Sequence, residues 1–167
     1  NFPAGTSAIS VDLIDPDFEF PQVMRATLGY ERELAWGIRA SLEGMYTQTE
    51  QDVVITNVGK SDTGAKTFDG RPRYASKSTS VANGYLLTNT DKGEQLNASL
   101  RLVKVFDFGL SFDVSYAWMD AESAFDATSS RAVSSFQFMP TRGEIFNYEL
   151  STSNFEVKDR FNAAASY

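Results

Sequence analysis

Hydrophobic and polar residues alternate along several stretches of the chain. In the first of these, Met24, Leu28 and Tyr30 share one parity, whereas Arg25 and Glu31 share the other. Successive side chains of a strand point to opposite faces, so the alternation predicts a β-strand with one apolar face and one polar face. The same pattern recurs in four later stretches, at residues 38–47, 95–105, 110–118 and 161–167.

The lengths of these stretches and of their connections form a second pattern. Each clean run lasts about 9–11 residues, the length of a tilted strand that crosses a bilayer. The connections near Trp36 and Phe108 are short, and residues 155–159 are predicted to form a third short connection. Long polar stretches, near residues 57–84 and 121–143, lie between them. Short turns that alternate with long loops are typical of outer-membrane β-barrels.

Aromatic residues collect near the ends of the predicted strands. One group flanks the short turns and the other lies toward the long loops: Trp36, Phe106 and Phe108, and then Tyr46, Tyr116 and Trp118. Aromatic girdles at the two membrane–water interfaces would place them in this way. A soluble β-sandwich remains an alternative, because a half-buried antiparallel strand shows the same alternation and its aromatic residues would form the core.

Composition narrows the range of functions. The net charge of −7, with no basic stripe, argues against binding of nucleic acid. The 167 residues include no Cys, which excludes disulfides and thiolate metal sites, and no His, the usual metal ligand and general base. Neither of the common glycine-rich phosphate loops occurs. We therefore expect neither an enzyme nor a bound cofactor.

The predicted strands are too few to form a complete membrane barrel. We count about six of them, whereas the smallest membrane barrels have eight strands. The chain also begins in a loop and ends within a predicted strand. We therefore predict an all-β fold, in which residues 1–167 form an antiparallel up-and-down meander that is part of a large transmembrane β-barrel.

Several short phrases occur along the chain in a fixed order. They are residues 13–23, 28–37 and 40–47, then Gly70-Arg71-Pro72-Arg73-Tyr74 and Asn89-Thr90-Asp91-Lys92-Gly93, then residues 129–135, and finally Ser151-Thr152-Ser153-Asn154-Phe155 with Asp159-Arg160-Phe161. Together they resemble segments of Oar-like (OmpA-related) TonB-dependent receptors. These segments follow the order of the family and span nearly the whole chain. The closing phrase of the family has His where Asp159 stands here.

The resemblance implies a position late in a 22-stranded transporter barrel whose lumen holds a plug. It implies that the chain forms channel wall and surface loops for the uptake or passage of a substrate across the outer membrane of a Gram-negative cell. Expected partners are outer-membrane lipid, the remainder of the barrel and its plug, and, through the resemblance alone, TonB. The alternative is a secreted or surface-exposed β-sandwich that binds carbohydrate or protein.

Two groups in the long loops are candidate sites. Arg71, Arg73 and Tyr74 are candidate ligand contacts, because Arg and aromatic side chains anchor recognition surfaces. Their alternative is a structured turn around Pro72 in which Arg pairs with a nearby Asp. The second group is formed by three carboxylates at the second long loop, Asp120, Glu122 and Asp126. Carboxylates can bind Ca²⁺, but the spacing of these three does not match an EF-hand pattern. We expect them to form a solvated acidic loop.

Charged residues of the polar parity are expected to line the lumen of a barrel. In a sandwich the same residues would be ordinary surface charges. They are Arg25, Arg39, Glu43, Arg101 and Asp113.

Overall fold

The computed structural model describes residues 8–140 and 143–167. Strands dominate these residues and only one short α-helix occurs among them, α1 (Ala132–Phe138), so the predicted all-β class is confirmed. The chain divides into two compact units. The meander unit contains Val23–Thr49, Gly93–Ser123 and Thr152–Tyr167, and the packed unit contains the segment ending at Gln22, Glu50–Lys92 and Ala124–Ser151.

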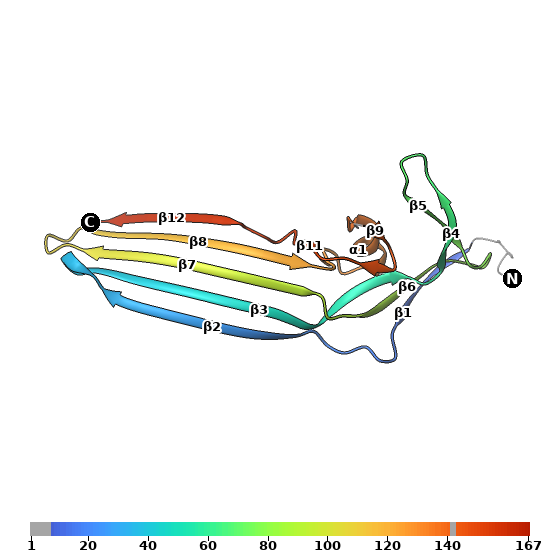
Figure 1. The fold of residues 1–167 in the computed structure, drawn as a ribbon, viewed down its shortest axis with the longest axis horizontal. Helices are drawn as coiled ribbons and strands as arrows, with labels where there is room; N and C mark the ends of the chain where they lie inside the picture. The colour runs from blue at the N-terminus through green and yellow to red at the C-terminus, as the bar shows by residue number, and fades with distance from the viewer. Residues whose placement is uncertain (1–7, 141–142) are drawn as a thin grey trace, which may run out of the picture. The chain divides into compact units, whose positions relative to one another are not determined.

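The meander unit is a sheet of long strands that lie side by side in chain order, with residues 58–92 and 124–158 inserted between two pairs of sheet neighbours. Its strands are β2 (Gln22–Glu33), β3 (Ile38–Asn57), β7 (Gly93–Val105), β8 (Ser111–Ser123) and β12 (Asp159–Ser166). β2 pairs with β3, and the antiparallel pairs β3–β7, β7–β8 and β8–β12 follow (Figure 1). This order is the predicted up-and-down meander.

The two short connections predicted near Trp36 and Phe108 are confirmed. The first contains η1 (Ala35–Gly37), and the Leu34 amide donates to the Ile38 carbonyl at 2.7 Å. Trp36 adopts φ 63°, a left-handed conformation that costs an L-residue roughly 1–2 kcal/mol. In the second connection the Phe106 amide donates to the Leu110 carbonyl at 2.8 Å, and Gly109 supplies the positive φ of the turn.

The predicted short connection at residues 155–159 was wrong. This segment runs beside β8 from β11 (Ser151–Thr152) to the start of β12, and both of these strands pair with β8. Backbone hydrogen bonds hold it there, from the Ser153 amide to the Ala121 carbonyl and from the Met119 amide to the Lys158 carbonyl. The Glu156 carboxylate also accepts from the Ala121 amide, so the chain continues along its neighbour instead of reversing.

In the packed unit, β6 lies between β1 and β3. β1 (Ile9–Ile14) is parallel to β6 (Val81–Thr90), which is antiparallel to residues 52–57 of β3. The prediction of a purely antiparallel sheet was therefore wrong at β1. Strands β2 to β5 intervene between β1 and β6 in the chain, and this long crossover permits the parallel pairing that a tight hairpin cannot make.

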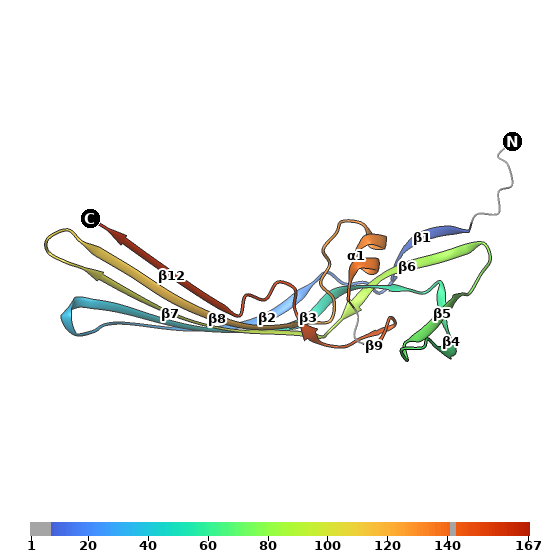
Figure 2. The same cartoon turned by 90° about the horizontal axis from the view of Figure 1, so that it is seen from above.

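Short elements cover the packed unit on both sides of its sheet. α1 lies over one face, where the rings of Phe136 and Tyr85 are 5.5 Å apart. The ribbon of β9 (Gly143–Glu144) and β10 (Asn147–Tyr148) lies over the other face (Figure 2). The buried hydrophobic core consists of Val54, Ile55, Tyr85, Ala124, Phe125 and Tyr148. Thus the elements that cover the sheet of the packed unit come from the second long polar stretch and the residues that follow it.

The first long polar stretch also contains a hairpin of β4 (Lys60–Lys66) and β5 (Pro72–Ser76). Its start is fixed by Asn57, which is 2% exposed. The side-chain amide nitrogen of Asn57 donates to the side-chain oxygen of Asn83. The side-chain oxygen of Asn57 accepts from the backbone amides of Gly59 and Gly84. A Cβ on Gly59 would lie 2.6 Å from the Gly84 amide nitrogen, so only glycine fits this crossing.

Candidate functional site

The pairing register of the meander unit places the apolar side chains of neighbouring strands opposite one another. Leu42 lies opposite Leu100, Leu100 opposite Tyr116, and Tyr116 opposite Phe161. The adjacent row contains Ala40, Leu102, Val114 and Ala163. A shift of one residue in any pair would move one whole hydrophobic set to the other face. The sheet therefore has one continuous apolar face, which we call the apolar face below.

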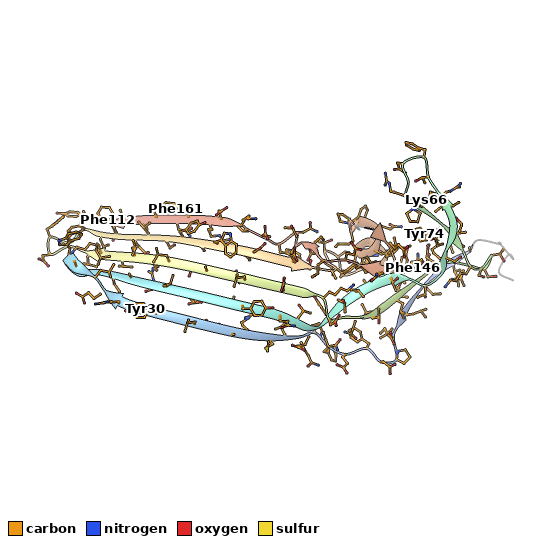
Figure 3. The ribbon with its side chains drawn as sticks, in the orientation of Figure 1. Tyr30, Lys66, Tyr74, Phe112, Phe146 and Phe161 are labelled. Carbon is orange, nitrogen blue, oxygen red and sulfur yellow. The ribbon has the colours of Figure 1, made fainter. Side chains whose placement is uncertain are left out.

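Nothing among the described residues covers this face. Leu28 is 80% exposed, Phe161 68% and Leu42 54%. Tyr30 on β2 and Phe161 on β12 are among the exposed side chains, at 59% and 68% (Figure 3). Soluble proteins rarely expose a contiguous apolar surface of this extent, and such a surface marks contact with a membrane or a partner.

The end of the apolar face beside the short turns is rich in aromatic rings. The Phe106 ring lies 5.3 Å from Phe108 and 6.0 Å from Phe112, measured between ring centroids. The Lys104 ammonium lies 5.1 Å from the Phe106 centroid and donates to the carbonyl of Trp36. Rings with a cation among them are the usual composition of a membrane–water interface.

The opposite end of the apolar face carries tyrosine, tryptophan and carboxylates. Tyr46 lies opposite Leu96, and its hydroxyl donates to the Glu94 carboxylate at 3.4 Å. Trp118 lies opposite Asp159, whose carboxylate accepts from the Tyr116 hydroxyl at 2.5 Å. The apolar rows therefore end in polar groups that can contact water, with aromatic rings at the boundary.

The other face of the meander unit is polar, and two ion pairs on it join neighbouring strands. The Arg101 guanidinium binds both carboxylate oxygens of Asp113, which lies two residues from the position opposite it. The Arg39 guanidinium lies 3.5 Å from the Glu31 carboxylate. Arg25 donates to the Thr47 hydroxyl at 3.2 Å. Glu43, which lies opposite Ser99, is on this face too. The five charged residues that were expected to line a lumen therefore share one face of the sheet.

The predicted loop contacts Arg71, Arg73 and Tyr74 lie at the β4–β5 hairpin, and the structure separates their environments. Arg71 binds the Asp69 carboxylate at 2.6 Å, as the structured-turn interpretation predicts. The Thr67 hydroxyl and the Arg71 guanidinium both donate to Asp69 and hold its pKa below the usual range. Arg73 is exposed, and only its carbonyl is engaged in the turn, by the Thr63 hydroxyl.

Tyr74 packs inward instead of facing solvent. Its ring makes an edge-to-face contact with Phe146, at 5.3 Å between centroids (Figure 3). Its hydroxyl is buried and has no hydrogen-bond partner among the described residues. The Tyr74 ring is therefore held against Phe146, and its role as a ligand contact stays a prediction.

The three acidic residues considered for Ca²⁺ do not come together. Asp120 and Glu122 lie on β8 and are exposed, whereas Asp126 lies beyond its end and is buried. Within residues 8–140 and 143–167, no group of three acidic side chains is placed to hold a metal ion. The exposed pair behaves as a solvated acidic surface.

The packed unit contains a pocket of about 460 Å³ between its sheet and the β9–β10 ribbon. Val54, Thr88 and Lys92 line its sheet side, and Phe146 and Asn147 line the ribbon side. The Lys92 ammonium donates to the Asn147 side-chain oxygen at 3.2 Å and to the Tyr148 carbonyl at 2.9 Å. These contacts fix the ribbon against the end of β6.

Two titratable groups stabilise the walls of this region. The Tyr148 hydroxyl donates to the Ile55 carbonyl at 2.6 Å, and burial raises the pKa of Tyr148 well above its ordinary value. It therefore stays protonated and remains a donor throughout the physiological pH range. The Thr88 hydroxyl donates to Asp15 at 2.7 Å and lowers the pKa of that carboxyl.

Sequence reasoning missed Phe146, Asn147 and Tyr148. They follow the second long polar stretch, where no periodicity marks a strand, and β10 contains only two residues. The one available signal was the pair of aromatic residues that flank Asn147 in an otherwise polar region. Their partners, Tyr74 and Ile55, are distant in the sequence.

No family model, curated protein or solved structure matches this chain. None of the described helices is long and apolar enough to cross a membrane. The geometry of the two units is therefore the basis for any functional conclusion.

Proposed function

We propose that this chain is a segment of an outer-membrane transporter or receptor barrel that resembles the TonB-dependent receptors, in which it forms channel wall and surface loops for substrate uptake. The observation that carries the proposal is the alignment of the apolar parities of successive strands on one uncovered face. A lipid bilayer is the environment in which such a face is stable, because acyl chains replace the missing protein contacts.

The extent of the apolar face fits a bilayer. From the row of Ile38 to the row of Tyr46 there are eight residues along β3. At about 3.4 Å per residue this is roughly 27 Å along the strand, or about 21 Å across the membrane at a tilt near 40°. The lipid-facing band of outer-membrane barrels is about 25 Å tall, so the two lengths agree.

The edges of the meander unit support a larger barrel. Among the described residues, β2 pairs only with β3, and β12 pairs only with β8. An open strand edge cannot lie in lipid, because its backbone donors and acceptors would have no partners. Five long strands are also fewer than the eight of the smallest membrane barrels. We therefore assign further strands to both edges, contributed by the remainder of the barrel.

The polar face is then the lumen wall, in contact with water and with a plug. Charged side chains such as Arg101 and Asp113 are compatible with this side because they keep access to water. The plug, TonB and the energy that TonB supplies belong to the proposal through the family resemblance of the sequence. Placement in a Gram-negative outer membrane follows from the same proposal.

The β-sandwich alternative requires a second sheet over the apolar face. In the described part of the chain, the elements outside the meander unit build a separate core around Tyr85 and Phe125. The side chains of Leu28 and Phe161 remain more than two-thirds exposed. This observation favours the barrel over the sandwich.

Fractionation of the source cells tests the proposal. An antibody raised against the β4–β5 hairpin should detect the protein in the outer-membrane fraction, at a mass well above the 18.5 kDa of this chain. The band should remain in the membrane after washing with high salt or carbonate, which removes peripheral proteins. A soluble band near 18.5 kDa would refute both the membrane location and the larger barrel.

A further inference from the structure

The pocket between β6 and the β9–β10 ribbon is lined by residues of the packed unit alone. We propose that this pocket binds a neutral saccharide. At about 460 Å³ it falls in the range of small-molecule sites, roughly 300–1,000 Å³. Its wall combines amide, carboxylate, ammonium and hydroxyl groups with two aromatic side chains, and this mixture determines which ligands it can accept.

Hydrogen-bonding groups at the pocket include both donors and acceptors. Within the described residues, the Gln51 side-chain amide and the amide nitrogen of Asn147 make no hydrogen bond. Lys92 uses two of its three ammonium protons on Asn147 and Tyr148, which leaves one for a ligand. The Asp91 carboxylate can only accept. Sugar hydroxyls both donate and accept, so they can use all four groups.

Of the two aromatic residues at the pocket, Tyr148 is buried and Phe146 is 40% exposed. The edge-to-face contact with Tyr74 fixes the orientation of the Phe146 ring (Figure 3). The face of an aromatic ring is electron-rich and attracts weakly positive C–H groups. A pyranose ring presents such C–H groups on one face and hydroxyls at its edge, so it can contact Phe146 and the amides together.

Other ligand classes fit less well. Asp91 and Lys92 are adjacent, so their charges largely cancel, and no Arg lines the pocket to bind a phosphate or carboxylate. A hydrophobic ligand would cover Gln51 and Asn147 without supplying hydrogen-bond partners for their amides, which is unfavourable. A neutral molecule that is rich in hydroxyl groups avoids both penalties.

The inference deepens the proposed function, on which it rests for the location of the pocket at the cell surface. It states that the barrel takes up or captures neutral carbohydrate. Binding by the purified protein and membrane location are independent measurements. A soluble protein that binds sugar would refute the barrel alone, and an outer-membrane protein that binds none would refute the pocket assignment alone.

An array of immobilised neutral oligosaccharides, probed with the purified full-length protein in detergent, is the test. We expect binding to at least one glycan. The variants Phe146→Ala and Asn147→Ala should each reduce the affinity about tenfold or more, which corresponds to about 1.4 kcal/mol. The matched control is Phe68→Ala, because Phe68 is a fully exposed aromatic residue at the β4–β5 turn and does not line the pocket. It should bind as the unchanged protein does.

Three outcomes would overturn the inference. The first is no binding to any neutral glycan on the array, and the second is binding only to sulfated or phosphorylated glycans added for comparison. The third is binding that Phe146→Ala and Asn147→Ala leave unchanged. Resistance of each variant to limited proteolysis checks that the packed unit is folded. Asn147 is exposed, so its replacement provides a reading even if the loss of Phe146 disturbs the core.

Discussion

Leu100 lies at the centre of the apolar face, between Leu42 and Tyr116 on the neighbouring strands. It is four residues from Leu96 in one direction and from Lys104 in the other, about 14 Å along the strand each way. In a membrane barrel this position is near the bilayer midplane. Replacing Leu100 with Arg should then cost about 2–4 kcal/mol of folding free energy, because Arg loses most of its hydration there.

The control for this prediction is the adjacent residue. Ser99→Arg introduces the same charge on the polar face, opposite Glu43 and Ala117. In a barrel this side chain meets water and a carboxylate, so its cost should be close to zero. The two substitutions are one position apart in the sequence, and they place the new Arg on opposite faces of the sheet.

Urea titration of the full-length protein, folded into lipid vesicles, measures the effect. Leu100→Arg should lower the free energy of unfolding by about 2–4 kcal/mol more than Ser99→Arg does. This difference corresponds to a shift of roughly 30- to 900-fold in the folding equilibrium. The same order should appear in cells as a lower yield of folded protein in the outer membrane. Equal costs for Leu100→Arg and Ser99→Arg, or a larger cost for Ser99→Arg, would refute the assignment of the lipid-facing side.

Two further predictions concern the packed unit. Gly59→Ala should destabilise it by about 1–3 kcal/mol, because the new Cβ would overlap the backbone of β6, and limited proteolysis should cut it faster. Gly29→Ala has open space around its Cβ and should leave proteolysis unchanged. Thr67→Val should raise the pKa of Asp69 toward its ordinary value, as measured by carboxyl NMR. Because the folded-state pKa is lowered, the turn is stabilised at neutral pH and loses this contribution as the pH falls through that pKa. An unchanged titration would contradict the Thr67 hydrogen bond.

The meander unit was largely predictable because its signal is local. One side of each strand is apolar, so the parity of Leu28, Leu42, Leu100 and Phe112 identifies both the strand and its face. The short turns near Trp36 and Phe108 follow from the restart of the pattern. The connection at residues 155–159 was misjudged because the chain there runs beside β8 with an irregular backbone, and an irregular strand has no regular alternation.

The packed unit could not be predicted in the same way. Val54 and Ile55 are buried on opposite faces of β3, so no alternation marks this part of the strand. The pairing of β1 with β6 and the contact between Tyr74 and Phe146 join residues about 70 positions apart. Such contacts depend on the tertiary fold, and a single sequence contains no local signal for them. The pairing of Arg71 with Asp69 was predictable, because the two residues are close in the sequence.

The pairing of charges on the polar face has a consequence for ion conduction. Arg101 with Asp113, and Arg39 with Glu31, each join a cation to an anion within the wall. The potential of such a dipole decreases faster with distance than that of a single charge, and salt screens what remains beyond about 8 Å. In the proposed barrel, we therefore expect this part of the wall to discriminate only weakly between permeating cations and anions. A pore that it bounds would select its solutes by shape and by hydrogen bonding, and not by the sign of their charge.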